Sequence, residues 1–251
     1  MDMEQSVSTL WQDAALAVIK DQFGEIFSYT IHQVWGDRIV LEATTSKVPT
    51  GIVIKASAEQ NVHDEAFVAK HARKVGVPGP TILAEGTDDR LPGTNWFIME
   101  KARGEKWESA MQTDAQTART LDDIGHIFAR LHRVETKNYG FLTSDMCGGY
   151  SSWSGWISAA LLSNSLPLVE KGFLPHYFLN MNKEVLKEFV PELDNVVPTL
   201  LHGDLGDGEV FVEHCGAGNG VCIDCTKVYG ETTLTHPAPH PSITMKAITN
   251  L

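Results

Sequence analysis

The chain has 251 residues, of which 20 are Lys or Arg and 32 are Asp or Glu, so its formal net charge at pH 7 is −12. Hydrophobic residues make up 43% and charged residues 21%, which is typical of a globular protein and not of a disordered one. The acidic balance argues against non-specific binding of nucleic acid and against docking on an anionic membrane, because both need a basic surplus. It is compatible with small-molecule ligands, and a negative surface attracts cationic ones.

Length and cysteine content indicate the organisation and the compartment. A chain of this length forms one large domain or two small ones, at ~100–200 residues per domain. The first residues are acidic and polar, unlike a secretory signal, and the longest apolar stretch, residues 156–169, is too short and too polar to span a membrane. The four cysteines are too few for a disulfide scaffold, so we expect a reducing, cytoplasmic setting.

The first hundred residues carry helical and β patterns in turn. Apolar residues at helical spacing from Leu10 to Ile19 predict an opening helix. The expected order of residues 27–100 is then strand, strand, helix, strand, strand. The runs behind this order are residues 27–45, 51–58, 61–76, 77–89 and 95–102. The face of the predicted helix is made by Val62, Ala66, Ala69 and Arg73. Residues 35–38 are typical of an ordinary hairpin turn.

From residue 101 the pattern is mainly helical. One stripe at helical spacing consists of Ala118, Leu121, Ile124, Phe128 and Leu131. Residues 153–162 and 183–190 are further helix candidates, and the loop expected between them is marked by Pro167, Gly172 and Pro175. Residues 209–214 and 220–224 predict a β-hairpin, because a glycine-rich turn separates two β-rich runs. Residues 230–251, rich in Thr, Pro and His, are expected to be irregular.

Three acidic residues flank the predicted hairpin. Asp204 precedes its first strand, Glu209 lies at the start of that strand and Asp224 ends the second, so antiparallel pairing would bring the three carboxylates together. Carboxylates packed closely are costly unless a cation neutralises them, which points to a Mg²⁺ ion held by Asp224 and Glu209. Asp204 would then orient or deprotonate a hydroxyl group. The alternative is that the three acids cap turns of a solvated hairpin.

This segment resembles the catalytic segment of the aminoglycoside phosphotransferase family, in which HGD is followed by a hairpin and then by ID. Four other segments within residues 25–230 resemble the same family in the same order, namely GIVIKAS, VHDEAFVAKHARKVGVPGP, NWFIMEKARGEKW and DDIGHIFARLHRVETKNYGFL. GGYSSWSGWI resembles a segment of the hygromycin phosphotransferase branch. The resemblance implies an α+β, bilobal protein-kinase-like fold. Its small β-rich nucleotide-binding lobe would cover residues 1–100, and its mainly helical catalytic lobe, with the catalytic hairpin, residues 101–251.

The resemblance also implies an activity and a set of residues that carry it. The activity is transfer of the γ-phosphoryl group of ATP to a hydroxyl group of a small polar molecule, such as a cationic, aminoglycoside-like antibiotic. Mg²⁺ would be held by Asp224 and Glu209, with Asp204 as the catalytic base. The implied nucleotide-binding residues are Lys55, for the phosphates, Glu65, which would pair with Lys55, and Met99, Glu100 and Lys101, beside the adenine. His202 is expected to brace the catalytic loop.

The chain departs from the family pattern in two places. The family normally has Asn where this chain has Glu209, and the added negative charge near the phosphates is expected to lower activity while the oxygen ligand is retained. The family also continues into several helices after the metal-binding Asp, whereas this chain ends at Leu251. The sequence is therefore expected to be a truncated or divergent member whose large lobe buries less apolar surface.

Two alternatives belong to other classes of function. The first is a kinase-like nucleotide-binding protein with little or no turnover, because of Glu209 or the short ending. The second is a structural zinc site, since Cys222 and Cys225 form a C-x-x-C pair with His214, Cys215, His236 and His240 nearby in the sequence. Against zinc, the pair lies in a strand and its exit rather than in a knuckle loop, and no second C-x-x-C exists.

Overall fold

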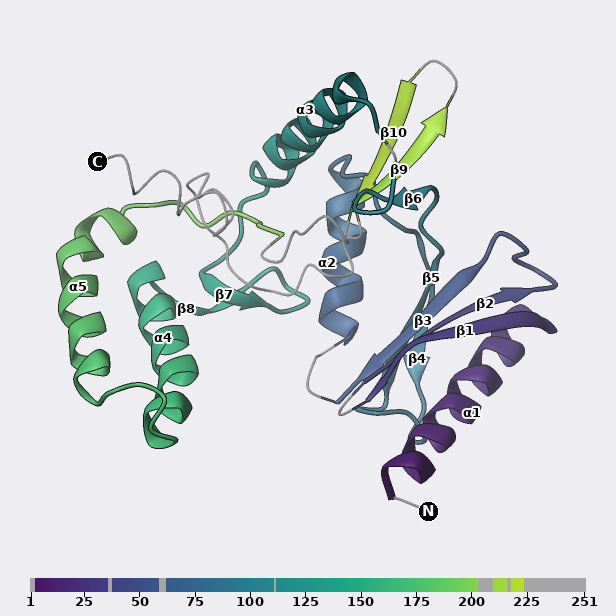
Figure 1. The fold of residues 1–251 in the computed structure, drawn as a ribbon, viewed down its shortest axis with the longest axis horizontal. Helices are drawn as coiled ribbons and strands as arrows, with labels where there is room; N and C mark the ends of the chain where they lie inside the picture. Colours follow the sequence, from purple (N-terminus) through teal and green to yellow (C-terminus); the bar gives the residue numbers. More distant parts are fainter. Residues whose placement is uncertain are drawn as a thin grey trace. The chain divides into compact units, whose positions relative to one another are not determined.

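The computed structural model describes residues 3–35, 38–58, 62–110, 112–202, 210–215 and 218–223 (Figure 1). Contacts divide these residues into two compact units. The first unit contains the described residues up to Ile127 and the strands within residues 210–223, and the second extends from Phe128 to His202. The placement of a nucleotide-binding lobe at residues 1–100 stays a prediction.

The first unit is built on a five-stranded antiparallel sheet with the strand order β1-β2-β3-β5-β4. Its strands are β1 (Ile26–Trp35), β2 (Arg38–Thr45), β3 (Ile52–Ser57), β4 (Ile82–Thr87) and β5 (Asn95–Glu100). The run 27–45 therefore contains two strands, so three strands and not two precede the helix. Trp35 pairs with Arg38, as the hairpin turn predicted at residues 35–38 requires. The predicted count was wrong because the order treated the run on both sides of that turn as one strand.

One face of this sheet is covered by the opening helix. Helix α1 (Met3–Phe23) confirms the first helical prediction. Its buried residues Ala14, Ala15, Val18 and Ile19 pack in one core cluster with alternate residues of β2 and β3, which are Ile39, Leu41, Ala43, Ile52, Ile54 and Ala56. Because side chains alternate along a strand, the residues between these point to the opposite face.

The opposite face is covered in part by helix α2 (Val62–Lys74), which lies beside β5 and β4 (Figure 1). Its Val62 and Ala66 pack against Phe97 and Met99 of β5. The predicted face was right for Val62, Ala66 and Ala69 and wrong for Arg73, which is exposed. Ala72 is buried in its place, because it follows Val68 and Ala69 at helical spacing while the Arg guanidinium reaches the Gly79 carbonyl.

A second sheet, with the order β10-β9-β6, joins distant segments of the chain within the first unit. Strands β9 (Val210–Cys215) and β10 (Gly218–Ile223) confirm the predicted hairpin. The short β6 (Glu105–Lys106) pairs with β9, and Trp107 N donates to Val210 O at 2.8 Å. The polar segment after β5 is thus tied to the hairpin.

Helix α3 (Asp114–Leu131) forms where it is predicted, but its buried face is rotated. Ala118 and Leu121 are exposed, whereas Ile124, Ile127 and Leu131 are buried together with Thr120. The hydroxyl of Thr120 donates to Gln112 Oε1 at 3.2 Å. A hydrogen-bonded threonine can be buried at little cost, and a search for apolar residues alone overlooks it.

The second unit consists of a short strand pair and two long helices. They are β7 (Tyr139–Leu142), β8 (Gly148–Tyr150), α4 (Trp153–Glu170) and α5 (Tyr177–Leu193). The strand pair was not predicted, and both helices are longer than the predicted segments. Pro167 lies in the last turn of α4 instead of in a loop. The helix ends at Glu170, with Lys171 as its C-cap and Gly172, whose φ is +75°, directly after it. Within the described residues, no helix is both long and apolar enough to cross a membrane.

Candidate nucleotide site

Two charged side chains meet in the interior of the first unit. Lys55 Nζ of β3 donates to Glu65 Oε1 of α2 at 2.6 Å, and both side chains are 5% exposed. Lys55 lies between Ile54 and Ala56, which point into the core beneath α1, so Lys55 points to the face covered by α2. The structure thus brings together the two residues predicted to pair.

Burial of this pair is a strong physical constraint. Two charges removed from water are tolerated only when they are paired and hydrogen-bonded, because each loses its hydration. The pair fixes the ammonium group of Lys55 at one point above the sheet. A cation that is fixed on a strand can bind a phosphate group.

Cross-strand pairing places the other predicted nucleotide residues relative to Lys55. Lys55 pairs with Val40 of β2 and Phe97 of β5, and the neighbouring row consists of Glu42, Val53 and Met99. Residues paired across strands lie on the same face, so Met99 and Lys55 share the face covered by α2. Met99 is 6% exposed, and it packs with Val62, Ala66 and Phe97. Met99 therefore belongs to the apolar layer packed between this face of the sheet and α2.

Glu100 and Lys101 lie at the end of β5, and both are exposed. The backbone N–H of Glu100 donates to Thr81 O at 2.8 Å, and that of Lys101 donates to Gly51 O at 3.0 Å. These two donors are engaged by the protein itself. The nucleobase of a ligand bound at this position would therefore contact the carbonyl groups or side chains of these residues, or the residues that follow them.

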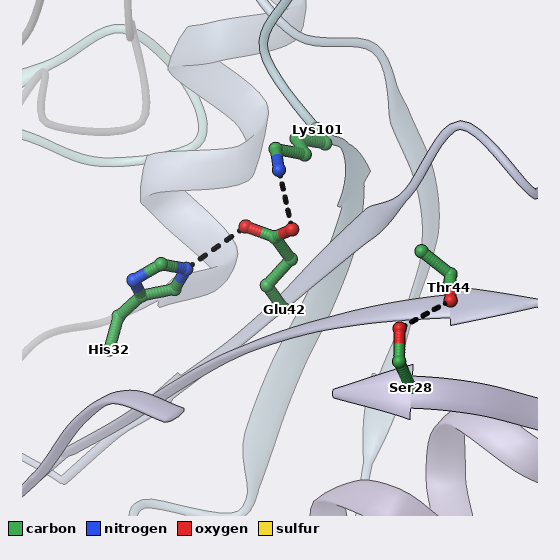
Figure 2. A network of polar contacts seen from close by, with 5 residues as sticks. All are labelled: Ser28, His32, Glu42, Thr44 and Lys101. Carbon is green, nitrogen blue, oxygen red and sulfur yellow. Dashed lines mark hydrogen bonds and ion pairs between the residues drawn. The ribbon is translucent and has the colours of Figure 1, made fainter. Parts of the chain in front are cut away.

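Sequence reasoning missed one polar cluster on the same face. Glu42 Oε1 accepts from Lys101 Nζ at 2.6 Å, and Glu42 Oε2 lies 3.1 Å from His32 Nε2 (Figure 2). Alternation along residues 38–45 indicates that Glu42 points away from the core beneath α1. Nothing in the sequence indicates that Lys101, 59 residues further on, is its partner.

The three predicted acids fall outside the described residues. Asp204, Glu209 and Asp224 are not among them, whereas the hairpin that they flank in the sequence is described. The last described pair of the hairpin joins Val210 to Ile223, which are the sequence neighbours of Glu209 and Asp224. His202 is 2% exposed, and its predicted bracing role stays a prediction.

No group of three or more His, Cys, Asp or Glu residues arranged to hold a metal is present in the described part of the chain. The zinc alternative depends on Cys225, His236 and His240, and all three lie outside that part. Both predicted metal sites therefore stay predictions.

A cavity of about 300 Å³ lies between α4 and α5 in the second unit. Its lining is mostly apolar and includes Ala159, Leu162, Leu179 and Leu186, with Lys183 and Asn182 among its polar residues. A polar, cationic molecule would lose hydration there without gaining enough partners. We therefore do not assign this cavity to the candidate site.

A five-stranded antiparallel sheet whose third strand carries a lysine, paired with a glutamate on the next helix, defines the kinase-like class of phosphotransferases. Solved structures of that class are similar to this chain. Aminoglycoside phosphotransferase APH(4)-Ia is 13% identical with a TM-score of 0.63, and the match covers 88% of this chain and 72% of that one. A thermostable mutant of it, in a ternary complex with AMP-PNP and hygromycin B, is 14% identical with a TM-score of 0.61, covering 84% and 70%.

A third similar structure is that of APH(2")-IIia in complex with GDP and kanamycin. It is 13% identical with a TM-score of 0.54, and the match covers 86% of this chain and 73% of that one. At such low identity these structures establish the fold, which is the α+β, protein-kinase-like fold expected from the sequence. The sequence model of the phosphotransferase enzyme family (APH) matches residues 52–229. The chain belongs to this family.

Proposed function

We propose that the protein transfers the γ-phosphoryl group of ATP to a hydroxyl group of a small polar molecule. The observation that carries this proposal is the buried ion pair of Lys55 and Glu65, which fixes a cation on the sheet of a chain that belongs to a phosphotransferase family. In the reaction, the hydroxyl oxygen forms a bond to the γ-phosphorus, the bond to the β-phosphate oxygen breaks, and ADP leaves.

The roles of the individual residues follow from their chemistry. Lys55 would bind the phosphates, Glu65 would keep Lys55 in place, and Asp204 would accept the proton of the attacking hydroxyl. The segment from Met99 to Lys101 would lie beside the adenine ring of ATP. Transfer of this kind depends mostly on positioning and on neutralised charge, so these few groups suffice.

The same site would hold Mg²⁺ between Asp224 and Glu209. Carboxylate oxygens are the ligands that Mg²⁺ prefers in proteins. The pairing of Val210 with Ile223 supports this choice, because those two residues adjoin Glu209 and Asp224 in the sequence. When bound, the ion supplies charge neutralisation for the phosphates.

A cationic, aminoglycoside-like acceptor fits the charge of the chain. A net charge of −12 favours the approach of cations, and carboxylates offer strong, charge-assisted hydrogen bonds to ammonium groups. Two of the similar structures contain hygromycin B and kanamycin. These observations support a cationic, aminoglycoside-like acceptor, and a screen of such compounds would identify the acceptor itself.

A second function is favoured by one residue. Glu209 stands where the family normally has Asn, and a charge at this place would oppose the negative phosphates. The protein would then bind nucleotide and turn it over slowly or not at all. Detecting ATP binding without phosphoryl transfer would support this second function over the first.

The test is a nucleotide-consumption screen against aminoglycosides, hygromycin-like compounds and amino alcohols, with ATP and GTP as donors. We expect at least one acceptor to accelerate ADP release by the wild type. The matched control is Asp204→Asn, which keeps the shape of the side chain and removes the base. Equal turnover by wild type and Asp204→Asn would overturn the assignment of Asp204, and no turnover with any acceptor would overturn the transferase proposal.

A further inference from the structure

A second ion pair, between Glu42 and Lys101, lies on the face of the sheet that carries Lys55. Figure 2 shows this pair together with His32. Glu42 of β2 accepts from Lys101 at 2.6 Å and contacts His32 of β1 at 3.1 Å. The Glu42 side chain is 19% exposed, against 46% for Lys101 and 49% for His32. One half-buried carboxylate therefore joins β1 and β2 to the segment that follows β5.

The register of the strands places this carboxylate in the candidate site. Glu42 pairs with Val53, and Val53 pairs with Met99. Paired residues share a face, so Glu42 lies in the row next to that of Lys55. Lys101 must extend past the start of β3 to reach Glu42.

Gly51 provides the room for this reach. Its φ is +102°, a region that favours glycine, and a Cβ added there would lie 3.1 Å from Lys101 Cδ and 3.2 Å from Lys101 Cβ. The carbonyl of Gly51 also accepts from the Lys101 backbone N–H at 3.0 Å. Both the backbone and the aliphatic stem of Lys101 are thus held against a position that has no side chain.

Glu42 is well suited to hold a cation. Burial raises the pKa of its carboxyl group, but hydrogen bonds from Lys101 and His32 outweigh burial and bring the pKa below its ordinary value of 4.5. The group is therefore ionised at neutral pH, and its bond to the ammonium is charge-assisted.

We propose that Glu42 is a positioning residue for the nucleotide site. By holding Lys101 against Gly51, it fixes the path of the chain directly after β5. That part of the chain is the one that would lie beside the adenine ring. The inference rests on the proposed function, because it assigns a consequence for nucleotide affinity. A surface ion pair that contributes only to folding would leave that affinity unchanged.

The experiment is calorimetric binding of three probes, ATP, adenosine and inorganic tripolyphosphate, to the wild type and four variants, namely Glu42→Gln, Lys101→Met, the double variant of these two, and Glu184→Gln. Glu42→Gln should lower the affinity for ATP and for adenosine by about five-fold, which is the size of effect expected for one partly exposed ion pair. The affinity for tripolyphosphate should not change. In the Lys101→Met background, Glu42→Gln should have no further effect, because the pair is already broken. Glu184→Gln breaks an exposed pair of the same 2.6 Å length on α5 and should change none of the affinities.

The outcomes separate this inference from the proposed function. A wild type that binds none of the probes overturns both. A wild type that binds ATP, with Glu42→Gln binding equally well, overturns the inference alone. Equal weakening of all three probes together with a lower melting temperature also overturns it, because Glu42 would then act on overall stability. Additive effects of Glu42→Gln and Lys101→Met would show that Glu42 does not act through Lys101.

Discussion

Lys55 Nζ and Glu65 Oε1 are 2.6 Å apart between a strand and a helix, and each side chain is 5% exposed. We expect this contact to be needed for phosphate binding but not to be the most stable packing between β3 and α2. Two apolar side chains of similar volume would hold β3 and α2 together as well or better, but they could not bind a phosphate. The pair is therefore expected to be required for activity and dispensable for folding, provided that both charges are removed together.

This expectation can be measured by chemical denaturation. Glu65→Leu leaves an uncompensated buried ammonium and should lower the free energy of unfolding by about 3–5 kcal/mol. Adding Lys55→Met should recover most of that loss, while nucleotide binding stays absent. Lys70→Met on the same helix breaks the exposed contact with Glu85 and should cost less than about 1 kcal/mol. A double variant as unstable as Glu65→Leu would contradict the role given to the buried charge.

Replacing Glu209 should increase turnover. Glu209→Asn removes a negative charge that would oppose the phosphates, so we expect the rate of ATP consumption to rise about three- to ten-fold at unchanged protein concentration. Asp207→Asn removes one charge from the same segment and is the matched control, for which we expect little change. If the rate of Glu209→Asn equals that of the wild type, Glu209 does not limit catalysis.

Gly104 and Gly125 should respond oppositely to alanine. Gly104 has a φ of +86°, and an added Cβ would lie 2.3 Å from Val212 O of β9, so Gly104→Ala should lower the free energy of unfolding by about 1–3 kcal/mol and loosen the hairpin. Gly125 lies in α3 with nothing within 4 Å of an added Cβ, so Gly125→Ala should stabilise by about 0.5–1 kcal/mol. Thermal denaturation measures both, and a stable Gly104→Ala would show that β9 can shift away.

His132 should make the stability fall in mild acid. Burial lowers the pKa of His132 from its ordinary value of 6.5. The unfolded chain thus takes up a proton at a higher pH than the native one. The stability that the neutral ring contributes is fully present above pH 6.5 and is lost as the pH falls through the native pKa.

The comparison is with His132→Phe, which cannot titrate. Between pH 7 and pH 5 its free energy of unfolding should fall less steeply than that of the wild type, by up to about 1.4 kcal/mol per pH unit for one proton. Above pH 7.5 the two curves should run parallel, which serves as an internal control. Parallel curves throughout the acid range would contradict a role for His132.

The elements that carry the candidate site were largely predictable. The period of apolar residues predicted α1 and α2, and β-rich runs on either side of a glycine-rich turn predicted the pair of β9 and β10. The contact of Lys55 with Glu65 was expected only from a family resemblance, because 10 residues of separation in sequence say nothing about which side chains meet. Their roles in nucleotide binding stay predictions.

Other features depend on tertiary contacts that a local pattern does not encode. Thr120 is buried because its hydroxyl finds a side-chain acceptor in Gln112, and polarity alone predicts the opposite. Strands β7 and β8 have four and three residues, which is too short for a period to be recognised. Glu42 and Lys101 meet only because β2, β3 and β5 are neighbours in the sheet.

The pairing of β6 with β9 has a consequence for how the protein is made. Lys106 of β6 pairs with Phe211 of β9, so β6 leaves the ribosome well before the strand with which it pairs. The sheet with α1 and α2 can acquire its core as soon as residue 100 has emerged, whereas β9 follows roughly 5–20 s later at typical rates of translation. During that interval the nascent chain can already form the ion pair of Lys55 and Glu65, but it lacks the segment that contains Asp204 and Asp224.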